Sequence, residues 1–97
     1  MAVYALFIRE GKIRDEAAMQ LYSQTARAAS NPDLGMQPLS MYGAITPLEG
    51  EPADGVVLLK FPDMGAAKAW YFSDGYQAAV PHRQNGADYR VMFVEGF

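Results

Sequence analysis

His82 is the only histidine in the chain, and it lies in the segment Pro81-His82-Arg83. An imidazole can act as a general acid or base near neutral pH if a partner fixes its tautomer and a substrate lies within hydrogen-bonding reach. Asp63, Asp74 or Asp88 could orient it. The alternative is a partly exposed histidine bonded to backbone, so His82 is a candidate catalytic residue with a structural role as its rival.

Two arginines could hold an anionic ligand. Arg83 follows the proline directly and could bind a carboxylate through two parallel hydrogen bonds. Arg90 lies in an otherwise apolar segment, on the face opposite its aromatic neighbours, so it must be paired or reach water. For both residues the alternative is an ion pair with Asp88, Glu95 or Asp63 that fixes the edge of a sheet.

An aromatic cluster could form a ligand pocket. It contains Trp70, Tyr71, Phe72 and Tyr76, and Tyr42 could contribute from another strand. Tyr42 and Tyr71 would then be orienting hydroxyl groups in an apolar pocket. The alternative for Trp70 is a core position, because it lies at helical spacing from Ala67 and Met64. A core position fits Tyr71 less well, because its hydroxyl needs a partner or solvent.

Composition argues against several function classes. The chain has no cysteine and one histidine, so we expect no disulfide, thiolate nucleophile, protein-only transition-metal site or cofactor. Its net charge is −3 and its eight basic residues are scattered, which argues against nucleic acid. No apolar run is long enough to span a membrane and the N-terminus does not resemble a signal peptide, so we expect a cytoplasmic protein.

The first half of the chain predicts a strand, a helix and a second strand. Val3–Ile8 is apolar on both faces, which is typical of a buried strand. Residues 16–29 have helical periodicity after Asp15, a plausible N-cap. Residues 39–46 alternate as a half-buried strand, and the proline- and glycine-rich residues 47–55 predict an exposed loop. Arg9 and Glu10 are expected to form a solvated strand end.

The second half predicts a strand, helical segments and a final strand. Val56–Phe61 is apolar on both faces, and Asp63 is a plausible N-cap for the helix that follows. Ser73-Asp74-Gly75 should break that helix. Another turn or two should follow until Pro81 kinks or restarts the segment, because its ring clashes with the carbonyl group of Gln77. Residues 88–95 predict the last strand.

The element order β-α-β-β-α-β predicts an α+β, ferredoxin-like domain over residues 1–97. With short connections and right-handed crossovers, the sheet is antiparallel and both helices cover one face. The first and third strands should be central because they are the most uniformly apolar. Their second face is also apolar and the chain has no further element to cover it, so we predict a homodimer whose two sheets face each other.

The chain resembles the DUF1330 family, a domain of unknown function within the dimeric α+β barrel superfamily. The specific motifs lie between residues 61 and 96: Phe61-Pro62-Asp63, Ala66-Ala67, Ala69-Trp70-Tyr71, Ser73, Tyr76-Gln77, Arg83, Ala87-Asp88-Tyr89-Arg90 and Val94-Glu95-Gly96. Asp74-Gly75 departs from the family, which more often has Pro-Glu there, and residues 30–37 replace its usual glycine-rich turn. The resemblance implies a dimeric barrel but no mechanism.

These observations predict a small homodimer that binds a small apolar or aromatic acid between sheet and helices. If it is an enzyme, an isomerase, a lyase or a cofactor-free oxygenase would fit. His82 would then be the acid or base, Arg83 the carboxylate clamp, and Tyr42 and Tyr71 the orienting hydroxyls beside Trp70. The alternative is a non-catalytic binding or assembly module whose polar residues only stabilise the fold.

Overall fold

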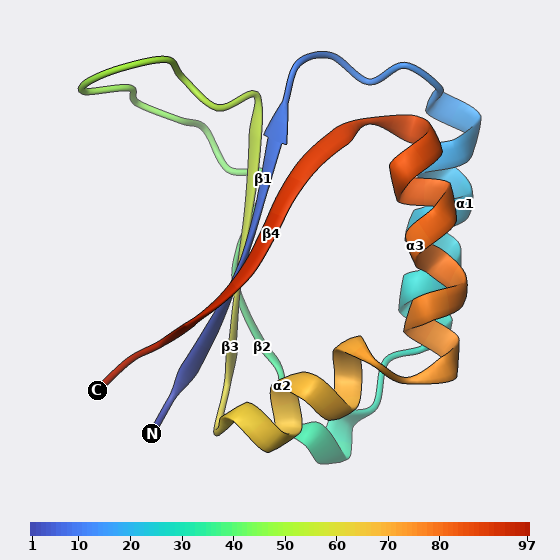
Figure 1. Cartoon of the computed structure of the whole chain (residues 1–97), viewed down its shortest axis with the longest axis vertical. Coiled ribbons are helices and arrows are strands. Elements are labelled where there is room, and N and C mark those ends of the chain that lie inside the picture. The colour runs from blue at the N-terminus through green and yellow to red at the C-terminus, as the bar shows by residue number, and fades with distance from the viewer.

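The computed structural model describes all 97 residues and has one antiparallel sheet in the order β2-β3-β1-β4, with helices along one face (Figure 1). The elements are β1 (Val3–Glu10), α1 (Glu16–Ala28), a short 3-10 turn η1 (Pro32–Leu34), β2 (Gln37–Met41), β3 (Gly55–Phe61), α2 (Met64–Tyr71), α3 (Asp74–Gly86) and β4 (Asp88–Glu95). The predicted ferredoxin-like topology is confirmed, with the first and third strands in the centre.

Side-chain caps begin each of the three α-helices. Asp15 accepts a hydrogen bond from the backbone N–H of Ala18, as predicted. Asp63 accepts one from the N–H of Ala66, and Ser73 begins α3 in the same way. Each cap satisfies a backbone donor that the first helical turn leaves without a partner.

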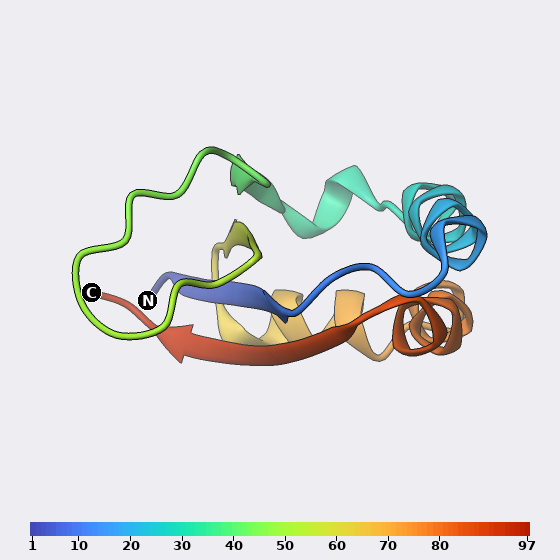
Figure 2. The same ribbon diagram turned by 90° about the horizontal axis from the view of Figure 1, so that it is seen from above.

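The core lies between the sheet and the helices. On β1 every second residue is buried, and β3 has the same alternation, so one face of the two central strands is covered. Trp70 of α2 packs against Phe7 and Phe61, and its ring centroid lies 4.2 Å from that of Tyr76 on α3. Helices α1 and α3 lie side by side when the molecule is seen from above (Figure 2).

Strand β2 is shorter than predicted. It ends at Met41, and the predicted extension to residue 46 is wrong. Tyr42 has φ 57°, a left-handed conformation that ends the extended backbone, although its N–H still donates to the carbonyl group of Val56. A register shift between Pro38 and Ser40 also interrupts the alternation, so that Pro38 and Met41 face the same side of the sheet as Leu59 and Val57.

Helix α3 continues through Pro81, so the predicted restart at this proline is wrong. Both Pro81 and Gln77 are exposed, so water can hydrogen-bond to the carbonyl group that the proline leaves without a donor. The continuous helix buries residues at helical spacing, namely Tyr76, Ala79, Val80, Arg83 and Gly86. His82 is therefore in the interior of a helix rather than at a helix start.

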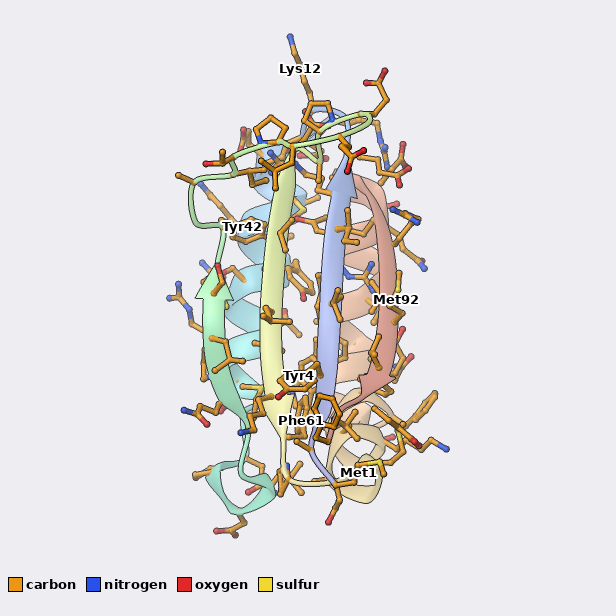
Figure 3. All side chains as sticks on the ribbon, turned by 90° about the vertical axis from the view of Figure 1, so that its left-hand side faces the viewer. Met1, Tyr4, Lys12, Tyr42, Phe61 and Met92 are labelled. Atoms are coloured by element: carbon orange, nitrogen blue, oxygen red, sulfur yellow. The ribbon has the colours of Figure 1, made fainter.

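The second face of the sheet has no covering element in this chain (Figure 3). Apolar side chains occupy it in rows across β3, β1 and β4, for example Leu58, Leu6 and Met92, which are register partners. The segment between β2 and β3 projects to this open side (Figure 1). None of the helices combines the length and the hydrophobicity that a membrane-spanning segment requires.

Candidate functional site

A cavity of about 490 Å³ lies between α1 and the sheet. Its walls come from α1, the three strands β1 to β3 and single residues beyond them, including Met36, Trp70 and Tyr89. Twelve of its nineteen lining residues are hydrophobic, so moving an apolar molecule from water into the cavity is favourable. Glu16 and Arg27, both exposed, supply opposite charges at its α1 wall.

Arg83 supplies a buried positive charge behind this cavity. Its residue exposure is 5 %, and its Nε has no hydrogen-bond partner. Its Cζ lies 5.6 to 5.8 Å from the ring centroids of Phe7, Tyr22 and Tyr89, three residues that line the cavity. The ring faces attract the cation, but no carboxylate neutralises it.

The sequence offered an ion pair with Asp88, Glu95 or Asp63 as the alternative role of Arg83 and Arg90, and the structure forms none of these pairs. Arg90 pairs with Glu10 across β1 and β4, and both side chains are exposed. Asp88 pairs instead with Arg14, at 2.7 Å. Arg90 is therefore a surface strand residue, whereas Arg83 is left as a buried cation without an acidic partner.

Two tyrosine pairs lie beside the cavity. The hydroxyl oxygens of Tyr22 and Tyr76 are 2.8 Å apart, and those of Tyr42 and Tyr89 are 2.6 Å apart. Within each pair one hydroxyl donates to the other, so one proton per pair is left for another acceptor. Tyr22, Tyr42 and Tyr89 line the cavity and can offer that proton to a ligand.

The tyrosine hydroxyls are donors rather than bases. Burial raises the pKa of Tyr22, and its neighbour Tyr76 raises it further, against a smaller lowering by Arg83. Burial also raises the pKa of Tyr76, although Tyr22 and Arg83 both lower it. Burial and the bond to Tyr89 raise the pKa of Tyr42. All three phenols therefore keep their protons at neutral pH.

The other predicted site residues are spread over different surroundings. Trp70 is buried in the core and also lines the cavity. Tyr71 lies outside the cavity, in a smaller hollow beside Phe72 and Phe93. His82, half-buried on α3, does not line the cavity.

None of the three aspartates that were expected to orient His82 forms a hydrogen bond or ion pair with it. Asp63 caps α2, Asp88 pairs with Arg14, and Asp74 is exposed in the first turn of α3. The structure thus brings Tyr42 and Trp70 to the cavity wall, places Arg83 directly behind that wall, and leaves His82 and Tyr71 outside.

Arg9 is a cavity residue that the sequence prediction missed. It was expected at a solvated strand end, but it lines the cavity and its Nε is buried without a partner. The sequence could have indicated this position, because alternate residues of a strand share one face. Arg9 continues the alternation of Val3, Ala5 and Phe7.

The sequence profile described as "Domain of unknown function (DUF1330)" matches residues 3–97. The chain belongs to the DUF1330 family. The resemblance seen in the motifs of residues 61–96 is thereby confirmed. No functionally curated protein matches this DUF1330 chain.

Solved structures share its fold at low sequence identity. The structure of the methylated RPA0582 protein is 20 % identical in sequence with a TM-score of 0.76, and the match covers 99 % of this chain and 81 % of that chain. RPA0582 is a protein of unknown function from Rhodopseudomonas palustris. A dimeric ferredoxin-like protein of unknown function from Jannaschia sp. CCS1 is 16 % identical with a TM-score of 0.71, over 99 % and 100 %. SnoaB from Streptomyces nogalater, described as a cofactor-independent oxygenase, is 11 % identical with a TM-score of 0.52, over 99 % and 91 %.

Proposed function

We propose that this DUF1330 protein binds a small organic acid with an apolar or aromatic body in the cavity between α1 and the sheet. The observation that carries the proposal is Arg83, a guanidinium that is almost fully buried and has no acidic partner. Buried charges in proteins are normally paired, so an unpaired one beside a cavity favours an anionic ligand.

The electrostatic attraction between the Arg83 charge and a ligand carboxylate is large enough for selective binding. At an effective dielectric constant of about 20, a unit charge about 7 Å from a carboxylate contributes about 2 kcal/mol. That is roughly a thirtyfold preference for the acid over a neutral analogue. The apolar walls around Trp70 and Met36 would hold the body of the molecule.

The site chemistry favours binding and orientation over proton abstraction. The phenols of Tyr22 and Tyr42 would donate hydrogen bonds to ligand oxygens, and Trp70 would pack against the ligand body. An isomerase, a lyase or a cofactor-free oxygenase acting on such an acid would use the same contacts. His82 and Tyr71 have no place in this binding proposal, because they lie outside the cavity.

The proposal is tested by titrating the protein with 4-phenylbutyrate and following the fluorescence of Trp70, the only tryptophan. Arg83→Met keeps the apolar stem and removes the charge, so it should weaken binding on the order of tenfold or more. Arg83→Lys keeps the charge and should retain part of the affinity. Arg90→Met is the control, because it removes an exposed arginine on the other face. Unchanged affinity in Arg83→Met would refute the proposal.

A second function, assembly into a homodimer, is favoured by the open face of the sheet. Tyr4, Leu6, Ile8, Val56 and Leu58 are only partly covered within one chain. An apolar sheet face of this kind needs a partner, and a second copy presents the same apolar surface. Several structures with this fold are described as dimeric, which supports the proposal. The two functions are compatible, because they use opposite faces of the sheet.

A further inference from the structure

Arg9 differs from Arg27, the other arginine that lines the cavity, in having a buried Nε without a hydrogen-bond partner. Its Nη2 donates to the backbone carbonyl of Asp54 at 2.8 Å, while its Nε is buried without a partner. Two carboxylates close to Arg9 in the chain or in the fold are engaged elsewhere: that of Asp54 accepts from the N–H of Gly11 at 2.7 Å, and that of Glu10 pairs with Arg90. Arg9 is therefore held in position but not neutralised.

Gly55 has no side chain and therefore leaves space for the guanidinium group of Arg9. It is buried opposite Arg9 in the sheet, and a Cβ at this position would lie 3.0 Å from Cδ1 of Tyr42 and 3.4 Å from Cζ of Arg9. The left-handed backbone of Tyr42 brings its ring over this glycine, and its hydroxyl reaches that of Tyr89. One proton of this hydroxyl pair is free, so a guanidinium and a phenol offer donors at the same end of the cavity.

The rest of the cavity becomes apolar along the strands. Val57 and Leu59 follow Gly55 on the same face of β3, and four residues of strand correspond to about 13 Å. Trp70 packs against Phe61, still farther along the strand. Along the strand wall, the cavity is thus polar at Arg9 and apolar toward Trp70.

We infer that Arg9, with the Tyr42–Tyr89 pair, is the direct binding site for the ligand's carboxylate, and that the ligand lies with its apolar body toward Trp70. The inference rests on the proposed function, and it names the ligand class as monocarboxylic acids with an extended aryl-alkyl or alkyl body. Arg83 acts through its charge behind Tyr89, whereas Arg9 touches the ligand and determines its orientation.

The first test compares 4-phenylbutyrate with its primary amide in Arg9→Gln, with Arg90→Gln as a control that removes the same charge from the opposite face. Arg9→Gln should weaken binding of the acid on the order of tenfold and leave the amide unchanged. Arg90→Gln should change neither by more than about twofold. If Arg9→Gln keeps the acid preference and Arg83→Met loses it, this inference is overturned while the proposed function stands. If the wild-type protein does not prefer the acid, both are overturned.

The second test uses the wild-type protein and needs no substitution. A series of ω-bromo acids from bromobutyrate to bromodecanoate places a heavy-atom quencher at increasing distance from the carboxylate. The inferred orientation predicts that Trp70 is quenched only by the longer acids at saturation. Strongest quenching by bromobutyrate would place the carboxylate beside Trp70 and overturn the orientation, as would quenching that is independent of length.

Discussion

The hydroxyl oxygen of Tyr22 on α1 lies 2.8 Å from that of Tyr76 on α3, and Tyr76 is fully buried. The bond joins the two helices directly behind the cavity. It also links the cavity wall to the core, because the ring of Tyr76 packs on Trp70. Loss of either hydroxyl should therefore affect both stability and the shape of the cavity.

Tyr22→Phe should destabilise the protein by about 1 to 3 kcal/mol, because it leaves the buried Tyr76 hydroxyl without its partner. The double variant Tyr22→Phe/Tyr76→Phe should recover part of this loss, since neither polar group is then left unpaired. Guanidinium unfolding of both single variants and the double variant measures the coupling. Additive losses would contradict a direct bond between the two hydroxyls.

The raised pKa values of Tyr22 and Tyr76 predict a loss of stability at alkaline pH. Both directions are upward from 10.0, so the phenols bind protons more tightly in the folded state than in the unfolded state. Their contribution is complete below pH 10 and decreases as the pH rises above it, because the unfolded chain then loses protons that the folded chain keeps.

Unfolding curves between pH 8 and 11 check this dependence against the double variant Tyr22→Phe/Tyr76→Phe. The variant lacks both phenols and should lose less stability over this range than the wild type. Equal alkaline slopes for the two proteins would show that these tyrosines are not responsible.

Gly55→Ala should distort the polar end of the cavity. The added Cβ would lie 3.0 Å from the Tyr42 ring, so the ring must move and the Tyr42–Tyr89 bond should weaken. We expect a loss of about 1 to 3 kcal/mol, as for other overpacked sites. Gly65→Ala in α2 is the matched control, because its Cβ meets only an ordinary contact of 3.4 Å and alanine favours the helix. Equal unfolding free energies for both variants would contradict the close approach at Gly55.

Leu58→Glu should convert a dimer into a monomer. Leu58 lies on the open face between its register partners Leu6 and Ser40, so a carboxylate there would be buried against the second sheet. Sedimentation equilibrium at micromolar concentration measures the mass. Leu21→Glu is the control, because Leu21 is 48 % exposed on α1, away from this face. A monomeric wild-type protein would contradict the homodimer.

The fold could be predicted because burial follows simple periods in this chain. The topology is indicated by three features of the sequence together: the uniformly apolar β1 and β3, the capping residues Asp15 and Asp63, and the order of the elements. Local backbone exceptions could not be predicted in the same way. A left-handed tyrosine ends β2, and a helix continues through Pro81 because the proline faces solvent.

The site could be predicted only in part, for the same reasons. Arg83 was recognised, but its burial follows from the helix that runs through Pro81 and places it seven residues after Tyr76 on one face. Arg9 could have been found from the alternation of β1. The tyrosine pairs could not, because each joins residues about fifty positions apart whose meeting depends on tertiary packing.

The role of the buried Arg83 charge is tested most directly by the affinity of the wild-type protein for 4-phenylbutyrate and for its primary amide, followed by Trp70 fluorescence. The two ligands share an apolar body and differ in charge, so the ratio of their affinities measures how much the unpaired buried cation favours an anionic ligand. We expect the acid to bind roughly tenfold or more tightly than the amide, and Arg83→Met to reduce this preference. Equal binding of acid and amide, or a preference for the amide, would contradict it.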